Sequence, residues 1–599
     1  MKKFLLVLTA LVLSLAFVAC GETTTEATTA APTTEEPAMQ VLNWNIGADP
    51  QTIDPTLNGA SDGGDVINQT FEGLVREVGG VVVAGIAESW TTSADGLTVT
   101  FTLRDSKWSD GSDLTASDFV YSWLRGMDQA TASEYAWIWE YTNIVGSIDA
   151  VYWSDECNNT TEVCNVYDED DELVGDDQAD GLGDDNGLNY ADTLAAVGIS
   201  APDDNTLVVE LVNPTPYFVS LMAFYHFMPV KQSAVEAVGG EEGLWAKDPD
   251  LVVCNGPFKL VEYVSGDGLK LVKNDEYWNA DEVYIDEIYG EFIELATTAY
   301  VAYNAGELDV LPSVPNAMVS ALIAEDPNFY VFPLLGTYYY NFNLDPSSPD
   351  YDPIFDNVNL RKALAYSIDR EAITEALSAG QVPATGFVPT GFLDDEGNDF
   401  AVESGNYGIA TDTSNYADAV TLFATAASDM SMTVAELQTA LEGKVILYNT
   451  SEGHKLVAEM VQESWRVNLG INVTLANEEW AVFQETRENG EFDIARGGWL
   501  TDFMDPAGLL AIFTSENAYN DPGYDNAAFD TLMTDAQATT DIATHFDKLY
   551  AAQDLLMADM PIIPVYYYAD TYLIRETVQD WGRSVLGSLD FTHATIVTE

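Results

Sequence analysis

The sequence predicts a mixed α/β fold, because strand-like and helix-like segments alternate along the chain. Residues 97–103 alternate apolar and polar side chains, as a strand with one buried face does. Residues 455–469 carry apolar side chains at helical spacing, and an expected strand at 471–475 follows them. Interleaving of this kind is typical of α/β and α+β proteins and argues against a β-sandwich or a helical bundle.

The other elements are expected from the same two periodicities and from capping residues. They are strands at 207–212 and 270–273, a helix at 116–125 after Thr115, and a helix at 360–376 after Asn359. No internal repeat is found. The body of the protein is expected to begin at Val41.

The composition describes a large and strongly acidic protein. The chain has 599 residues, enough for two to four domains, and 98 acidic against 22 basic side chains give a formal net charge of −76. Binding to DNA or RNA is therefore excluded, because phosphate affinity needs a cationic surface. The charge attracts cationic solutes. Adaptation to a saline habitat would explain this large negative charge, and so would a merely acid-biased surface.

The N-terminus has the features of an export signal. Within residues 1–19, two lysines precede an apolar run from 4 to 18, which is too short for a stable membrane span. Small residues before Cys20 resemble a bacterial lipoprotein cleavage site, so we expect Cys20 to carry a lipid anchor. The alternative is an ordinary secretory signal. Residues 20–40, rich in Thr, Glu and Pro, are expected to form a disordered tether.

Two of the four cysteines lie in an unusual polar segment. Cys157 and Cys164 belong to an acidic insertion at 154–190. Because disulfides persist outside the cytoplasm, we expect these two cysteines to form a small loop bridge, with two free thiols as the alternative. Cys254 is then left unpaired and is expected to be buried.

The same acidic insertion is a weak candidate for a calcium site. Asp176, Asp180 and Asp184 supply oxygen ligands at short spacing. The twelfth position of a calcium loop that starts at Asp176 is Gly187, where a bidentate Glu is required. A solvated acidic loop is the alternative, and no other metal or cofactor is expected.

Several sequence blocks occur in a characteristic order along the chain. The main blocks lie at 71–75, 107–111, 255–258, 274–278, 498–506 and 561–566. Together they resemble the extracytoplasmic oligopeptide-binding proteins of peptide ABC transporters, which are solute-binding proteins of family 5. The resemblance covers about residues 41–572.

The resemblance implies a periplasmic-binding-protein-like fold of two lobes joined by a hinge, with an extra α+β domain. Closure of the lobes would trap the ligand between them. The matching blocks divide the chain into lobe I (41–71, 231–304 and 569–599), the extra domain (72–230) and lobe II (305–568).

The resemblance also implies a site for the ends and backbone of a peptide. Asp502 matches the aspartate that binds the ligand's ammonium group, through a charge-assisted hydrogen bond. The alternative is a loop aspartate that only caps backbone amides. Trp499 matches a cleft tryptophan, or it belongs to the core. The backbone that adds the ligand as a strand would come from Gly498, Trp499 and Leu500 in one lobe and Asn58, Gly59 and Ala60 in the other.

Basic side chains at the spacing that the family uses for ligand carboxylates are Arg496, Arg487 and His454. Basic residues are scarce in this chain, although any one of the three would also be explained as neutralising its neighbours. Aromatic residues that match cleft positions are Tyr135, Trp480 and Tyr568, with packing as the alternative.

The expected function is therefore the capture of short peptides outside the cell and their delivery to a membrane permease, by a monomeric, lipid-anchored protein. Alternatives are the same fold with another solute (a nickel chelate, haem, a sugar or a murein peptide) and a peptide-sensing surface receptor. An enzyme is not expected. The four histidines are scattered, and no nucleophile elbow, zinc motif or phosphate loop is present.

Overall fold

The computed structural model describes residues 39–153, 164–167, 173–177, 190–237, 244–501, 503–515, 517 and 519–597. Several predictions lie outside these residues: the signal peptide, Cys20, the tether up to residue 38, Cys157, Asp180, Asp184 and Asp502. Cys164 and Asp176 lie in the paired strands β8 (Cys164–Tyr167) and β9 (Leu173–Asp177), of which only the backbone is described.

One eleven-stranded sheet organises the body of the protein. Its order is β12-β13-β14-β1-β15-β21-β16-β20-β18-β19, and β17 pairs with β21. The strands are β1 (Val41–Asn45), β12 (Phe258–Val264), β13 (Gly268–Lys273), β14 (Glu287–Glu291), β15 (Val310–Pro312), β16 (Phe329–Phe342), β17 (Val382–Pro383), β18 (Val445–Asn449), β19 (Thr474–Glu478), β20 (Ile494–Leu500) and β21 (Ile562–Ile574).

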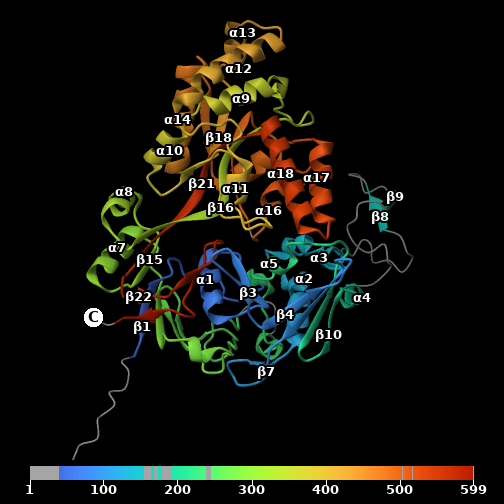
Figure 1. The fold of residues 1–599 in the computed structure, drawn as a ribbon, viewed down its shortest axis with the longest axis vertical. Coiled ribbons are helices and arrows are strands. Elements are labelled where there is room, and N and C mark those ends of the chain that lie inside the picture. The colour runs from blue at the N-terminus through green and yellow to red at the C-terminus, as the bar shows by residue number, and fades with distance from the viewer. Residues whose placement is uncertain are drawn as a thin grey trace, which may run out of the picture. The chain divides into compact units, whose positions relative to one another are not determined.

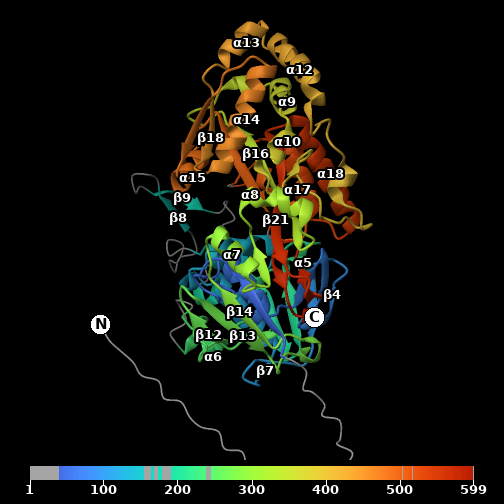
Figure 2. The ribbon, with the colours of Figure 1, turned by 90° about the vertical axis from the view of Figure 1, so that its left-hand side faces the viewer.

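The two longest strands, β16 and β21, connect the two halves of this sheet. The strands around β1 and those around β18 lie at opposite ends of them (Figures 1 and 2). The β16–β21 pairing is interrupted between the pairs Pro333↔Ala569 and Thr337↔Tyr567, so three residues of β16 face only Tyr568. Such an irregularity locally disrupts a ladder and bends the strands.

A second sheet is built from residues 87–210. Its order is β10-β11-β5-β4, from β4 (Ala87–Thr92), β5 (Thr98–Leu103), β10 (Ile199–Asp203) and β11 (Thr206–Glu210). Helix α2 (Ala116–Met127) packs beside it and begins with a capping box, in which Thr115 and Asp118 satisfy each other's backbone amides. The strands and the helix expected in this region are confirmed, with ends that differ by one to two residues.

A buried ion pair joins α2 to the segment before the first helix of the chain. The Arg125 guanidinium donates to both oxygens of Asp54, at 3.0 and 2.8 Å, and the Trp245 indole donates to Asp54 Oδ2 at 3.0 Å. Both charged side chains are buried. The bidentate geometry and the third donor offset the cost of removing these charges from water.

Helices cover the half of the sheet around β18. The single helix expected at 360–376 is two helices, α9 (Val358–Tyr366) and α10 (Arg370–Leu377). The prediction was wrong because the Asp369 carboxylate accepts from the Ala372 amide at 3.0 Å and starts a new helix, while Asn357, not Asn359, caps the first. The helix expected at 455–469 is α14 (Glu452–Asn468), and its strand is β19.

The remaining elements are short or peripheral. The helices are α1 (Ser61–Thr70), α3 (Ser147–Val151), α4 (Tyr190–Ala195), α5 (Phe218–Leu221), α6 (Gln232–Glu236), α7 (Ala296–Ala305), α8 (Asn316–Glu325), α11 (Phe400–Ser404), α12 (Tyr416–Asp429), α13 (Val434–Ala440), α15 (Trp480–Glu488), α16 (Ala507–Leu510), α17 (Ala527–Gln537) and α18 (Ile542–Asp559). The strands are β2 (Val75–Val78), β3 (Val81–Ala84), β6 (Ser106–Lys107), β7 (Asp113–Leu114), β22 (Val578–Gln579), β23 (Gly582–Arg583), β24 (Leu589–Asp590) and β25 (Thr595–Ile596).

Cys254 is a free, fully buried cysteine, as the sequence predicts. Burial raises the pKa of its thiol to about 11, so it is unreactive at neutral pH. Among the described residues, no helix has the length and apolar character needed to cross a membrane, and no cluster of three potential metal ligands occurs.

Candidate functional site

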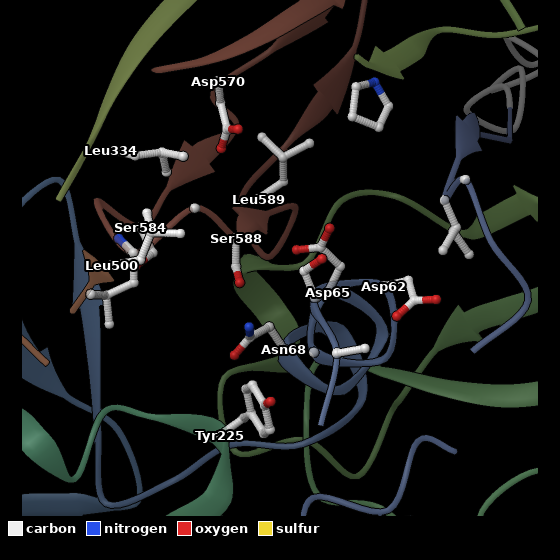
Figure 3. A pocket seen from close by; sticks show the side chains of 18 of the residues that line it. Asp62, Asp65, Asn68, Tyr225, Leu334, Leu500, Asp570, Ser584, Ser588 and Leu589 are labelled. Atoms are coloured by element: carbon white, nitrogen blue, oxygen red, sulfur yellow. The ribbon is translucent and has the colours of Figure 1, made fainter. Parts of the chain in front are cut away.

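A cavity of about 880 Å³ lies where several parts of the chain meet. Its wall is formed by the start of α1, by β16 and β21 beside their irregular pairing, by the end of β20, and by residues 584–590 (Figure 3). This volume falls in the range of small-molecule and peptide sites. The cavity is therefore the candidate binding site.

Carboxylates dominate the charged groups of this wall. Asp62 and Asp65 extend from α1, and Asp570 extends from β21 on the other side of the cavity (Figure 3). Burial and the nearby Asp570 charge raise the pKa of Asp65 to about 7. Burial also raises the pKa of Asp570, although the Arg583 guanidinium, 3.2 Å away, opposes the shift. Both raised pKa values come mainly from burial, which disfavours the ionised carboxylates.

Strand β20 reaches the cavity with one of its edges open. Its pairing with β16 runs from Ile494 to Leu500, whereas its pairing with β18 involves only Ile494 and Ala495. In the part of the chain that the structure describes, no other strand pairs with that second edge at residues 496–500. Alternate N–H and C=O groups there are available to an added strand.

The three residues expected to lend backbone to a ligand from lobe II lie on this edge. Gly498 lies beside the Tyr568 hydroxyl and the Arg496 guanidinium, so a Cβ at this position would collide with both. The half-buried Trp499 donates from its indole to the Gly508 carbonyl at 3.0 Å, which ties β20 to α16. Leu500 is half exposed and lines the cavity.

Arg496 lies in an aromatic box. Its Nη2 donates to the Tyr568 hydroxyl at 2.7 Å, and its guanidinium lies 5.1 Å from the centre of the Tyr338 ring. The buried hydroxyls of Tyr338 and Tyr340 interact with each other, whereas the buried Nε atom of Arg496 has no acceptor among the described residues. Unsatisfied buried donors are costly, so this cluster favours an added acceptor such as a carboxylate.

His454 lies beside this box and is neutral at pH 7. Its ring centre is 5.5 Å from that of Tyr338. Burial and the Arg496 charge lower the pKa of His454 to about 4. It can therefore donate a hydrogen bond to an anion without contributing a positive charge, unless the anion itself raises its pKa.

Arg487 is engaged elsewhere. Its Nε lies 3.1 Å from Asp521 Oδ2 and its Nη2 donates to Gln484 at 2.8 Å. Both members of the ion pair are buried. This pairing favours the alternative that the residue neutralises a neighbour, and its role in ligand binding stays a prediction. Trp480, also on α15, is 47% exposed and stacks on Phe483 away from the cavity wall.

Asn58, Gly59 and Ala60 precede α1. The Asn58 side chain donates to the Ala60 carbonyl at 2.7 Å, and the Asn58 carbonyl accepts from the Tyr225 hydroxyl at 3.2 Å. Asn58 is therefore buried and occupied, whereas Gly59 and Ala60 are exposed and line the cavity. Tyr135 also lines it, packed on Phe224 with ring centres 5.4 Å apart.

Nine of the thirteen predicted ligand residues fall into three groups, while Gly498 and Trp499 lie on the open edge of β20, Asn58 is buried before α1, and Asp502 lies outside the described residues. The cavity brings together Gly59, Ala60, Tyr135 and Leu500; the aromatic box holds Arg496, Tyr568 and His454; Arg487 and Trp480 lie together on α15. Asp65, Asp570, Tyr338 and Tyr340 were not among the predicted residues. Tyr338 and Tyr340 lie two positions apart in a run of three tyrosines, and residues two apart in a strand share one face. No pattern in the sequence connects the two aspartates.

Comparison with known proteins identifies the family to which the chain belongs. The model of the bacterial extracellular solute-binding proteins, family 5, matches residues 81–521, and the chain belongs to this family. The oligopeptide-binding protein OppA of Bacillus subtilis is 33% identical over 562 residues, which cover 92% of each chain. The periplasmic murein peptide-binding protein MppA of Escherichia coli is 32% identical over 540 residues, covering 90% of this chain and 89% of that protein.

Solved structures of related binding proteins support the same family assignment. MppA in its unliganded open form has a TM-score of 0.74 at 29% identity, and the match covers 94% of this chain and 98% of that one. Haemophilus influenzae OppA in complex with the peptide RPPGFSPFR has a TM-score of 0.67 at 29% identity, covering 94% and 99%. The expected two-lobe periplasmic-binding fold is confirmed. The family is one of binding proteins, several of which are named for peptides.

Proposed function

We propose that this protein captures short peptides in the cavity beside β20. The observation that carries the proposal is the open edge of β20 from Arg496 to Leu500, which ends at the cavity. A peptide added to this edge satisfies its backbone without regard to sequence, and hydrated side pockets can then accept different side chains. Relatives of matching length that are named for oligopeptide binding support the same conclusion.

The two ends of the peptide are recognised by opposite charges. Asp502, two residues beyond Leu500, binds the ammonium group. Arg496, with the Tyr338 and Tyr340 hydroxyls and neutral His454, receives the carboxylate or a backbone carbonyl of the ligand. The buried Arg496 Nε donor supports this assignment, because an acceptor on the ligand offsets the cost of burying that donor.

The two lobes can close over the ligand by bending at the long strands β16 and β21. The interruption of the β16–β21 ladder beside the cavity leaves few hydrogen bonds to hold the two halves of the sheet at a fixed angle. We assign the hinge to this place, with 41–71, 231–304 and 569–599 as lobe I, 72–230 as the extra domain and 305–568 as lobe II. Hinge closure then removes water from both terminal sites.

The protein works outside the cytoplasm as a monomer tethered by lipid at Cys20, and it delivers its ligand to an ABC permease without itself catalysing a reaction. The apolar run at 4–18 followed by a small residue and Cys20 supports this. A murein peptide is the second candidate ligand, favoured by the similarity to MppA in sequence and structure.

Calorimetry with one tetrapeptide in three forms tests the proposal. The free peptide should bind at least tenfold more tightly than its N-acetylated and C-amidated forms, because each modification leaves a charged group of the site without its partner. A murein tripeptide is the fourth ligand to be titrated. If it binds most tightly of the four, a murein peptide is the ligand of this protein. Equal affinity for the free and acetylated forms would reject the assignment of Asp502.

The acidic wall leads to a prediction about cationic side chains. With a pKa of about 7, Asp65 is half protonated at neutral pH, and a lysine side chain in the cavity favours its ionised form. Binding of a lysine-containing peptide at pH 7 should therefore release up to about half a proton more than its norleucine analogue. Titrations in buffers of different ionisation enthalpy measure this difference.

Two variants control this measurement. Asp65→Asn should abolish the extra proton release, whereas Asp281→Asn, at an exposed position outside the cavity wall, should preserve it. At pH 9 the extra release should disappear, since Asp65 is then already ionised. Identical proton release for the lysine and norleucine peptides at pH 7 would show that no cation enters this part of the cavity.

A further inference from the structure

His545 is a fully buried histidine whose two ring nitrogens both face oxygen acceptors. It lies on α18, and its Nδ1 is 2.8 Å from the Ala536 carbonyl oxygen. Its Nε2 is 2.9 Å from Asp505 Oδ2. The other Asp505 oxygen accepts from the Ala507 amide at 2.8 Å. No predicted ligand residue is among these contacts.

This geometry determines the protonation state. A carbonyl oxygen only accepts, so Nδ1 must carry a proton. A carboxylate also accepts, so Nε2 carries the second proton as long as Asp505 is ionised. His545 is therefore an imidazolium in a buried ion pair. Burial alone lowers the pKa of His545, but the Asp505 charge and the two hydrogen bonds outweigh burial and raise it above the ordinary 6.5.

The ion pair holds the segment 503–506, which leads into α16. Asp505 Oδ1 accepts from the Ala507 amide at the start of α16, and the Gly508 carbonyl in α16 accepts from the indole of Trp499. The Thr501 hydroxyl donates to the Phe503 carbonyl at 2.9 Å. The position of α16 thus sets the position of Trp499 and of the end of β20.

We propose that His545 is a positioning residue: its imidazolium, acting through Asp505, holds α16 and Trp499 where the open edge of β20 can accept a peptide. The inference rests on the proposed peptide site, although the protonation state itself does not. Loss of the second proton leaves Nε2 facing a carboxylate with no hydrogen to share, so the pair breaks and the segment loosens.

The sign of the pH effect follows from the raised pKa. The ion pair is fully present below pH 6.5, and its contribution is lost as the pH rises through the higher value in the folded protein. Peptide affinity should therefore fall at alkaline pH.

The other groups that face His545 do not reverse this effect. Tyr217, with its ring centre 6.5 Å away, is buried, and both burial and Asp505 raise its pKa, so it stays neutral. On α17 and α18, Asp535 and Lys548 form an exposed pair at 2.6 Å, and Asp541 contributes only its backbone carbonyl to the His545 amide.

The test compares pH profiles of peptide affinity for wild type, His545→Gln and His593→Gln. Glutamine can donate to Asp505 at every pH, whereas His593 is exposed and lies outside the cavity wall. Between pH 6.5 and 9, wild type and His593→Gln should lose several-fold more affinity than His545→Gln, because only a histidine at position 545 loses its second proton as the pH rises through its raised pKa. Titration of the peptide's amino group affects all three proteins equally. Parallel profiles for wild type and His545→Gln would overturn the proposal.

Nitrogen-15 NMR of histidine-labelled protein provides a readout that needs no ligand, and the His545→Gln variant serves only to assign the signal. The buried histidine that is absent from the His545→Gln spectrum should have both ring nitrogens protonated at pH 6.5 and should lose one proton at higher pH. A neutral ring at pH 6.5 would overturn the proposal. Absence of peptide binding at every pH, together with the imidazolium signal, would instead reject the proposed function and leave the ion pair established.

Discussion

Replacement of Asp502 by asparagine lowers the affinity for peptides with a free amino terminus by about 100-fold, or ~3 kcal/mol, the expected cost of removing one partner of a desolvated charge pair. Asparagine keeps the size of the side chain and removes only its charge. The neighbouring Thr501 is buried, and its hydroxyl donates to the Phe503 carbonyl at 2.9 Å. Calorimetry with a free tetrapeptide measures the loss.

The matched control is Asp525→Asn. Asp525 is an exposed loop aspartate outside the cavity wall, so its replacement makes the net charge less negative by the same amount and should leave affinity unchanged. The N-acetylated peptide should bind wild type and Asp502→Asn equally weakly. If Asp502→Asn binds the free peptide as tightly as Asp525→Asn does, the carboxylate at 502 serves its own loop and not the ligand.

Replacement of Arg496 by methionine should weaken binding of peptides with a free carboxyl terminus by about 30-fold, or ~2 kcal/mol, as expected when a hydrogen bond to a charged group is lost. The guanidinium has one hydrogen-bond partner among the described residues, the Tyr568 hydroxyl, while its Nε atom has none. Methionine fills most of the aromatic box and removes the charge. Competition binding with free and amidated peptides measures the effect.

The control for this variant is Arg466→Met, at an exposed arginine of α14 that is paired with Glu463 at 2.6 Å. Both variants remove one positive charge, so a difference between them reports the site and not the overall field. Thermal unfolding of Arg496→Met separates loss of binding from loss of folding. An equal reduction in affinity for free and amidated peptides would show that Arg496 supports the box without contacting a carboxylate.

The elements with clear periodicity were predictable, and the exceptions have local causes. The strand at 98–103 and the helices at 116–127 and 452–468 follow from their patterns. Helix 360–376 was predicted as continuous because its apolar spacing hides a capping aspartate at 369 in the middle. The pairing of β16 with β21 joins segments more than 220 residues apart, and no local signal in the sequence specifies its interruption at residues 334–336.

The chemistry of the site was only partly predictable, because it also depends on contacts between segments that are far apart in the sequence. The motif at 498–506 identified the strand that has the open edge, because its residue types are contiguous. The state of each charge depends on distant partners. Arg487 is paired with Asp521, and His454 is kept neutral by burial and by Arg496. Burial raises the pKa of Asp65, and the charge of Asp570, some 500 residues away, adds to the shift.

The central claim is that a peptide lies along the edge of β20 with its amino terminus on Asp502. A crystal structure of the protein with a bound tetrapeptide tests it most directly. The account predicts a carboxylate oxygen of Asp502 within about 3 Å of the peptide nitrogen, the usual length of a charge-assisted bond, and peptide amides paired with residues 498–500. A ligand bound elsewhere, or an Asp502 side chain turned toward its own loop with the peptide in place, would contradict it.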